Sequence, residues 1–216
     1  DANDSSGNAN NGTSTSITYS LANGKIGQGA GFNGTSSQIS LVDTASLHLT
    51  SSITLSAWVK TSYTANYQLI FSALDTNSTA GTPYLGFYLI INQTTGYCVF
   101  TTGNNNSAAT STTDNVNVCT GLWRNIILTY DGSTARFYNN GSASVSGANT
   151  RVPTYPSTIY PRIGVWYASR LGNNYFFNGS MDEVILESSV WSAEKIRKYY
   201  TYTKGILKKK KKTLSK

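Results

Sequence analysis

A series of short segments in which apolar and polar residues alternate constrains the fold most strongly. Residues 53–61, ITLSAWVKT, alternate throughout, and a period of two places successive side chains on opposite faces of a β-strand. Residues 38–43 also alternate, and further strand-like segments, bounded by turn residues, occur at residues 67–74, 84–92, 97–102, 123–130, 134–139, 160–167 and 181–188. About a dozen short strands with long polar loops predict an all-β protein, a two-sheet antiparallel β-sandwich of the jelly-roll type.

Two dipeptides and one helical segment complete the predicted order of elements. Asp131-Gly132 and Asn140-Gly141 are typical of tight turns between antiparallel strands. After residue 191, Ser192 can act as the N-cap of one short C-terminal helix, and Gly205 stands where a C-terminal cap is expected. Ile196, Tyr199 and Tyr200 would share the buried face of this helix.

The net charge of the chain comes from its last residues. The formal charge is +7, and seven lysines follow residue 203, whereas ten basic and ten acidic residues precede it. We therefore expect a neutral domain over residues 1–203 and a Lys-rich tail or linker over residues 204–216. A neutral domain argues against a nucleic-acid-binding face, which needs clustered cations. The tail could contact a membrane or an anionic polymer.

Two cysteines, Cys98 and Cys119, occur in a chain rich in Ser, Thr and Asn. Such a pair suggests an exported protein with one disulfide, which would close a loop of about 20 residues and stabilise the fold by roughly 3 kcal/mol. Two free buried thiols are the alternative. Seven Asn-x-Ser/Thr sequons, an opening residue Asp1 without methionine, and the lack of a long apolar run fit a secreted or cell-surface protein, as a mature or excised chain.

Five segments, in order along the chain, carry specific motifs. They are DSSGNANNGT (4–13), GKIGQGAGFNGTSSQISLVD (24–43), ITLSAWVKT (53–61), WRNIILTYDGSTARFYNNG (123–141) and FFNGSMDEVILESSVWSAEKIRKYY (176–200). Together they resemble the laminin-G-like jelly-roll domains of the concanavalin A-like lectin/glucanase superfamily, over about Asp4 to Tyr200. The resemblance implies two sheets packed face to face and a role in adhesion or carbohydrate binding. It also implies a structural Ca²⁺ in many members.

The resemblance places a calcium site where the N-terminal loop meets the last strand. Asp182 and Asp4 match the family's acids, and Asn8 and Asn33 are candidate ligands by loop type. Calcium needs several hard oxygens, which these side chains offer. Strand alternation places Asp182 with Val184 and Leu186 on one face, and Glu183 with Ile185 and Glu187 on the other. Alternatively, Asp182 caps loop amides without a metal, and Glu183 forms a salt bridge or hydrogen bond inside the sandwich.

A glycan hydrolase is disfavoured by the spacing of the acids. Glycosidases need two facing carboxyl groups, and the glucanases of this superfamily carry Glu-x-Asp-x-x-Glu or a close variant on one strand. Here the nearest segment is DEVILE, in which Ile185 stands between Glu183 and Glu187. We therefore expect a protein without catalytic residues.

Aromatic and amide residues near position 170 form the candidate binding site. Trp58, Trp123 and Trp191 are interpreted as packing residues, whereas Trp166 precedes a loop of variable type. The candidate ligand-binding residues are Trp166, Tyr167, Arg170, Asn173, Asn174 and Tyr175. Flat rings combined with hydrogen-bonding groups suit sugars, whose C–H faces stack and whose hydroxyls need directed partners. Alternatively, Trp166 merely covers the end of a sheet.

These features predict an exported, non-catalytic module that binds a glycan or glycoprotein through loops at one rim, supported by structural calcium. The alternative function is protein adhesion or assembly into a surface fibre, with another protein as the partner.

Overall fold

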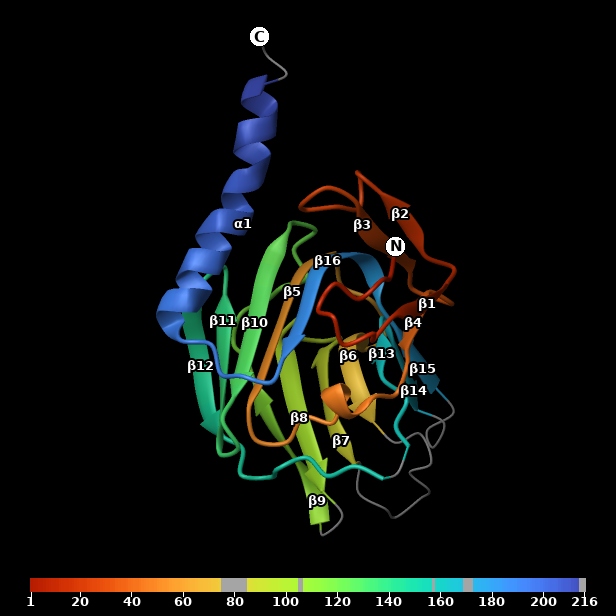
Figure 1. Ribbon diagram of the computed structural model, residues 1–216, viewed down its shortest axis with the longest axis vertical. Coiled ribbons are helices and arrows are strands. Elements are labelled where there is room, and N and C mark those ends of the chain that lie inside the picture. The colour runs from red at the N-terminus through yellow and green to blue at the C-terminus, as the bar shows by residue number, and fades with distance from the viewer. Residues whose placement is uncertain (75–84, 105–106, 157, 169–172, 214–216) are drawn as a thin grey trace.

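The computed structural model describes residues 1–74, 85–104, 107–156, 158–168 and 173–213. Two seven-stranded antiparallel sheets pack face to face (Figure 1). In pairing order, sheet A contains β1 (Gly12–Thr15), β4 (Gln38–Leu41), β13 (Arg162–Ile163), β6 (Gln68–Leu74), β7 (Gly86–Ile91), β8 (Cys98–Asn104) and β9 (Ser107–Thr113). Sheet B contains β12 (Ser142–Ala148), β11 (Thr134–Asn139), β10 (Arg124–Tyr130), β5 (Ile53–Thr61), β16 (Asn178–Glu187), β3 (Gly29–Asn33) and β2 (Thr18–Ser20). A separate hairpin joins β14 (Val165–Ala168) to β15 (Asn173–Phe176), and η1 (Ala45–Leu47) is a single 3₁₀ turn.

The sandwich confirms the predicted fold class. The alternation in residues 53–61 forms β5 with the same bounds, and Ile53, Leu55, Ala57 and Val59 face the core. Two expectations about bounds are wrong. The N-terminal segment, expected as a loop, contains β1. The segment 160–167 breaks at Gly164, which has a φ of 84° and whose α-carbon hydrogen lies against the ring of Phe32.

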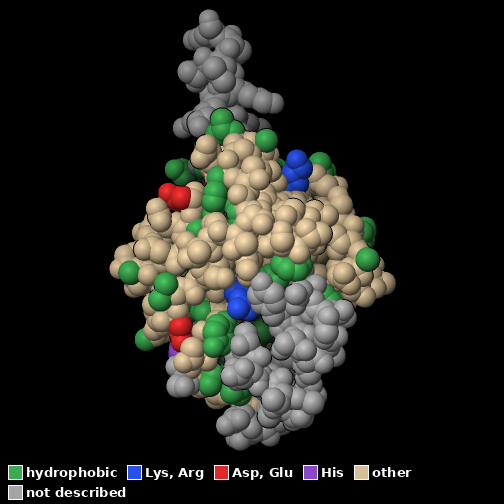
Figure 2. Space-filling view, turned by 90° about the vertical axis from the view of Figure 1, so that its right-hand side faces the viewer, with side chains coloured by type: hydrophobic (Ala, Val, Ile, Leu, Met, Phe, Trp, Pro, Cys, Tyr) green, Lys and Arg blue, Asp and Glu red, His purple; other side chains and the backbone are tan. Residues whose placement is uncertain are grey.

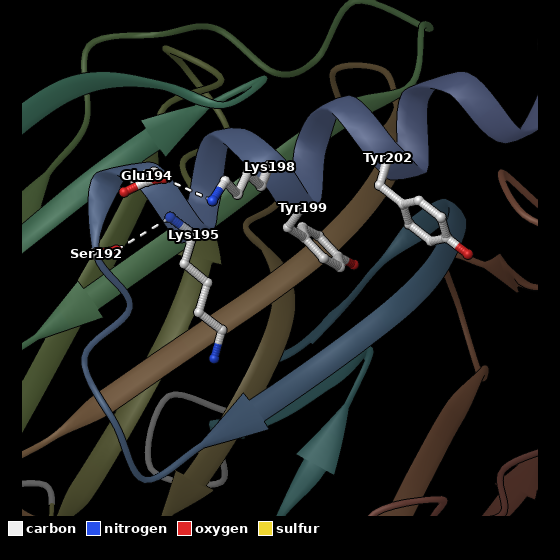
Figure 3. Close-up of a pocket in the computed structure, with 6 residues that line it drawn as sticks. All are labelled: Ser192, Glu194, Lys195, Lys198, Tyr199 and Tyr202. Carbon is white, nitrogen blue, oxygen red and sulfur yellow. Dashed lines mark hydrogen bonds and ion pairs between the residues drawn. The ribbon is translucent and has the colours of Figure 1, made fainter.

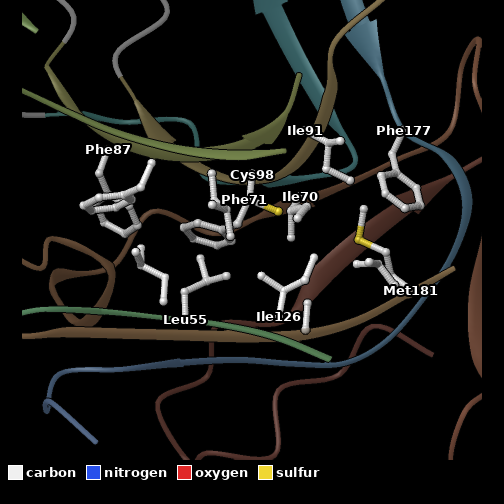
Figure 4. Packing of buried hydrophobic residues seen from close by; sticks show 14 of the residues in the cluster. Leu55, Ile70, Phe71, Phe87, Ile91, Cys98, Ile126, Phe177 and Met181 are labelled. Carbon is white, nitrogen blue, oxygen red and sulfur yellow. The ribbon is translucent and has the colours of Figure 1, made fainter. Parts of the chain in front are cut away.

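Large apolar side chains of both sheets fill the space between them (Figure 4). Phe71 and Phe87 extend from sheet A toward Leu55, Ile126 and other residues of sheet B. These side chains have almost no exposed surface. Each fully buried side chain of this kind contributes about 1.5–3 kcal/mol from transfer out of water, so this core supplies the main stabilising free energy.

The turn prediction at Asn140-Gly141 is confirmed. Asn140 has a φ of 49° and Gly141 a φ of 78°, the pair of positive values that a two-residue hairpin turn requires. The turn joins β11 to β12 and completes one edge of sheet B.

The C-terminal helix α1 (Ala193–Thr213) packs on the outer face of sheet B. Ser192 is its N-cap, as predicted, because its hydroxyl accepts the backbone N–H of Lys195 at 3.2 Å. Ile196 is buried against Ile127 and Trp191. One part of the prediction is wrong: Gly205 does not end the helix, which continues to Thr213 and extends beyond the sandwich (Figure 1). A glycine inside a helix costs only about 1 kcal/mol relative to alanine, and the lysines that follow are good helix formers.

The surface is mainly polar but uncharged. Figure 2 shows a face on which Lys, Arg, Asp and Glu are scattered singly among uncharged atoms. In the described part of the chain, no helix is long and apolar enough to cross a membrane.

Candidate functional site

The β14–β15 hairpin positions the predicted aromatic residues against sheet A. Trp166 pairs with Tyr175, Tyr167 with Asn174, and Ala168 with Asn173. Both strands of the hairpin lie beside β6. The segment after Trp166 was expected to be a loop, but residues 173–176 pair as a strand, so Trp166 and Tyr175 are held on a regular element.

Four rings form an aromatic cluster, which consists of Tyr67, Tyr88, Trp166 and Tyr175. Trp166 is stacked on Tyr88 with a centroid distance of 5.0 Å and an interplanar angle of 25°. It also contacts Tyr175 at 5.4 Å, and Tyr175 meets Tyr67 edge-on at 5.5 Å. Tyr88 and Tyr175 are each only 8% exposed, whereas Trp166 is half-buried. The cluster therefore has a rigid base and presents part of one indole ring to solvent.

A row of polar side chains crosses the outer face of sheet A at the level of Tyr88. Ser72 pairs with Tyr88, Tyr88 with Thr101, and Thr101 with Ser111. The hydroxyls of Thr101 and Ser111 lie 2.8 Å apart. On the other side of Ser72 the row continues to Arg162. We call Arg162, Ser72, Tyr88, Thr101 and Ser111 the polar row. It brings hydrogen-bonding groups and a cation to the face that carries the aromatic cluster.

The structure brings together part of the predicted ligand-binding set. Trp166 and Tyr175 belong to the aromatic cluster, and the backbone of Tyr167, Asn173 and Asn174 lies in the hairpin. Arg170 lies outside the described residues. Sequence reasoning considered Tyr88 as a possible extension of this face but missed Tyr67 and the rest of the polar row. Ser72 is a polar residue within the apolar segment 67–74, and only the strand register places it beside Tyr88.

Asp182 holds the loop between β2 and β3. Its Oδ2 accepts the backbone N–H groups of Lys25 and Ile26, each at 2.7 Å, and its Oδ1 accepts that of Glu183 at 2.9 Å. The carboxylate is 9% exposed. This arrangement agrees with the alternative in which Asp182 caps loop amides.

The other three predicted calcium ligands lie at two separate places. Asp4 organises the N-terminal loop: its oxygens accept the N–H and hydroxyl of Ser6 and the N–H of Asn10, and these hydrogen bonds lower its pKa. Asp4, Asn8 and Asp182 line one cavity. Asn33 does not line it, and its Oδ1 instead accepts three N–H groups of its own turn, from Thr35, Ser36 and Ser37. The chemistry of these oxygens suits calcium, but most of them already accept hydrogen bonds. Over the described residues, no group of three acidic, His or Cys side chains is placed to hold a metal.

A β-bulge at Glu183 makes the predicted distribution of side chains on β16 wrong. Asp182 pairs with Trp58 and Ile185 with Ser56, so three steps along β16 match two steps along β5. The extra residue is Glu183, with a φ of 51°. As a result, Asp182 shares the outer face with Ile185 and Glu187, whereas Val184 and Leu186 face the core.

The two acids after Asp182 have different surroundings. Burial and the adjacent Asp182 raise the pKa of Glu183, for which we find no ion pair or side-chain hydrogen bond among the described residues. Its predicted salt bridge or hydrogen bond inside the sandwich is therefore not observed. Burial raises the pKa of Glu187, but hydrogen bonds from Ser189, Trp191 and Lys195 outweigh it and lower the pKa.

The predicted disulfide is not formed. Cys98 and Cys119 are free thiols, both buried in the core between the sheets. Burial raises the pKa of Cys119 to about 11 and also raises that of Cys98, which keeps both sulfurs protonated and unreactive at neutral pH. The sulfurs pack as small apolar groups, and that of Cys119 lies 3.9 Å from the side-chain amide of Gln68.

A shallow groove runs along α1 (Figure 3). It is lined by Ser192, Glu194, Lys195, Lys198, Tyr199 and Tyr202. Glu194 and Lys198 form an ion pair at 2.7 Å, and Lys195 contacts Glu187 at 3.2 Å. The charged side chains of the groove therefore already have ion-pair partners within the chain. Fewer of them are left to bind a ligand.

A family model described as the concanavalin A-like lectin/glucanases superfamily, of the laminin G type, matches residues 33–197. The chain belongs to this superfamily. No curated protein matches the sequence.

Solved structures of the same fold include domain 4 of AbnA, a GH43 extracellular arabinanase from Geobacillus stearothermophilus, in complex with arabinotriose. It is 24% identical, the match covers 92% of each chain, and the TM-score is 0.72. The binding domain of Paraclostridial Mosquitocidal Protein 1 is 13% identical over 93% of this chain and 49% of its own, with a TM-score of 0.67. The receptor binding domain of botulinum neurotoxin D is 15% identical over 92% and 49%, with a TM-score of 0.68. This superfamily member spans about half the length of the two toxin domains.

The superfamily contains both lectins and glucanases, so membership does not decide between binding and hydrolysis. In this member, Asp182 and Glu187 share one face of β16. Asp182 holds a loop and Glu187 pairs with Trp191 and Lys195. A general acid for glycoside hydrolysis needs a raised pKa, whereas that of Glu187 is lowered. Glu183 has a raised pKa and stands on the bulge. Asp4 lines the same cavity, but its oxygens accept the N–H groups of Ser6 and Asn10 and its pKa is lowered.

Proposed function

We propose that this chain is a non-catalytic module that binds a glycan, either free or carried by a glycoprotein. The binding surface is the outer face of sheet A, where the aromatic cluster meets the polar row. Recognition uses stacking of a sugar ring on Trp166 and hydrogen bonds to the hydroxyl side chains beside it.

The observation that carries this proposal is the position of Trp166. Its ring is only half-buried, yet it stacks on the buried Tyr88, which is itself a member of the polar row. A half-buried indole held on Tyr88, on the face that also carries the exposed hydroxyl of Ser111, offers both a flat stacking surface and a directed hydrogen bond. Domain 4 of the arabinanase AbnA has the same fold and was solved in complex with arabinotriose, which supports a sugar as the type of ligand.

Two further parts of the proposal concern calcium and location. Calcium would bind at the cavity shared by Asp4, Asn8 and Asp182 and support the N-terminal loop, although Asp182 must then share its oxygens with the N–H groups of Lys25 and Ile26. Export to the cell surface or medium is supported by the sequons and the polar, weakly charged composition. The free cysteines neither require nor exclude export.

A glycan array tests the proposal. The whole chain is used, because α1 continues past residue 203, and the array is run at low and high salt, with calcium and with a chelator. The set of glycans includes arabinotriose. We expect selective binding that survives high salt, since contacts of the lysine tail would be screened. Binding lost at high salt would assign it to the lysines, and a blank array with folded protein would favour protein adhesion.

A further inference from the structure

β16, the strand of sheet B that comes last in the chain, is paired on both sides over only part of its length. Residues 179–181 of β16 pair with both β5 and β3. Beyond Met181 the ladder with β3 ends, whereas the ladder with β5 continues to Glu187. No backbone hydrogen bond from the rest of the described chain reaches the other side of residues 184–187. This stretch, Glu183–Glu187, is therefore an open edge within the sheet.

A cavity lies alongside the open edge and leaves room for another strand. It has a volume of about 700 Å³ and is lined by the whole stretch Asp182–Ser188. Core residues of both sheets line it, which are Phe32, Phe71 and Met181, together with Leu49 from the segment before β5, and the N-terminal loop lines another wall. Residues 183–187 are half-buried, whereas Ser180, Met181 and Asp182 are buried. Burial therefore decreases one residue after the ladder with β3 ends.

The bulge at Glu183 stands at the start of the open edge. Bulges commonly re-aim a strand or end its pairing, and here the bulge coincides with the end of the β3 ladder. Proteins usually pair, charge or cover an open edge. The N-terminal loop approaches this edge, but its backbone bond is made between Gly12 and Ala2 rather than to β16.

The charge of the cavity indicates what kind of segment would fit. Five acidic residues line it, and no Lys, Arg or His does; the acids are Asp1, Asp4, Asp182, Glu183 and Glu187. Asp1, Asp4, Asp182 and Glu187 accept hydrogen bonds within the chain. Glu183, at the start of the edge, is the acid left for an incoming cation. A strand placed here would continue the existing β3–β16 ladder and direct alternate side chains to the core residues that line the cavity.

We propose that the open edge of β16 accepts an extended strand from a partner polypeptide by β-strand addition. The strand carries apolar side chains at alternate positions and a lysine or arginine near Glu183. Backbone hydrogen bonds to residues 183–187 supply affinity, and these core residues and Glu183 supply selectivity. This site lies along β16 of sheet B, whereas the polar row lies on the outer face of sheet A, so it does not depend on glycan binding. Its cavity is also the one proposed for calcium, so the binding tests below are made in a chelator.

Hydrogen exchange with a defined probe tests the strand addition. The probe is a short synthetic peptide of alternating valine and threonine with one central lysine, added to the whole chain. We expect slower exchange, by at least about tenfold, of those amides of residues 184–187 that point away from β5, and unchanged exchange in β12, an outer edge of the same sheet. A peptide N-methylated at alternate residues cannot complete the ladder and should give no protection. No protection, or equal protection of β12, would overturn the proposal.

The charge preference and the type of partner are tested separately. Glu183→Gln should weaken binding of the lysine peptide at least about fivefold, while Glu194→Gln, an acid of α1 outside the cavity, should leave it unchanged. Unfolding midpoints of both variants confirm that they are folded. If the unchanged chain, Glu183→Gln and Glu194→Gln bind the lysine peptide with equal affinity, the proposed preference for a basic strand is wrong. Sedimentation of the chain without peptide distinguishes the two kinds of partner. A dimer in which the same amides are protected would mean that the strand comes from a second copy of the chain and would contradict a separate partner polypeptide.

Discussion

The indole ring of Trp166 and the phenol ring of Tyr88 are stacked 5.0 Å apart, although the two residues belong to different sheets of the structure. Tyr88 is buried in the middle of sheet A, and Trp166 lies on the separate hairpin. The contact therefore fixes the hairpin on the face that carries the polar row. Because Trp166 is proposed to bind the ligand and also holds the β14–β15 hairpin in place, its substitution should lower both affinity and stability.

Replacing Trp166 with alanine should reduce both properties. Half-buried packing on Tyr88 and Tyr175 is lost, so we expect a loss of about 1–3 kcal/mol in the free energy of unfolding, less than for a fully buried tryptophan. Glycan binding should fall at least about tenfold. Urea unfolding and titration with a glycan identified on the array measure the two effects.

Trp166→Phe is the matched control for this change. It keeps a flat ring on Tyr88, so it should retain most of the stability and part of the affinity. If the alanine variant folds with full stability and full affinity, Trp166 neither anchors the hairpin nor contacts the ligand. If the alanine variant does not fold, Trp166 is a core residue.

Asp182→Asn should destabilise the chain under all conditions. The carboxylate accepts three N–H groups in a nearly buried position, and hydrogen bonds to a charged group contribute about 1.5–3 kcal/mol. With calcium at the cavity, the loss should be larger in calcium than in a chelator. Thermal unfolding in both media provides the measurement, and equal losses would mean that Asp182 acts through hydrogen bonds alone.

Stability should decrease at alkaline pH in part because of Tyr130. Burial, with a contribution from the charge of Asp131, raises its pKa to about 12, against about 10 for an unfolded tyrosine. The unfolded chain therefore releases this proton first, and the stabilisation is complete below pH 10 and is lost as the pH rises through 12. Tyr130→Phe should show a shallower decline over this range in denaturant titrations. An identical decline in both proteins would exclude Tyr130 as a contributor.

The cysteines should react only after unfolding. In native buffer, burial should protect Cys98 and Cys119 from iodoacetamide. In denaturant without reductant, intact mass should show alkylation of both. A chain that gains alkyl groups only after a reductant is added would contain the disulfide after all.

Local patterns predicted much of the fold. The alternation in residues 53–61, the Asn140-Gly141 turn and the Ser192 cap each depend on neighbours in sequence, and each is found in the structure. The assignment to two packed sheets followed from the number and length of such segments together with the family motifs.

The missing parts depend on contacts between distant segments. The bulge at Glu183 reverses the faces of β16, and its origin is the register with β5, more than a hundred residues earlier. Tyr67 joins the aromatic cluster because the hairpin folds back over β6, which no local pattern shows. In the candidate site, the sequence therefore identified Trp166 and Tyr175 but neither Tyr67 nor the stacking of Trp166 on Tyr88.

The position of β16 in sheet B has a consequence for synthesis on the ribosome. β16 is the last strand of the chain, yet it lies between β5 and β3, so β2 and β3 join the sheet only through it. β2 and β3 can pair with each other, but they cannot join the rest of sheet B until β16 has left the exit tunnel. Contacts so far apart in sequence make folding slow and leave the incomplete chain open to aggregation. A nascent chain of this design would therefore benefit from a chaperone until its final strand is released.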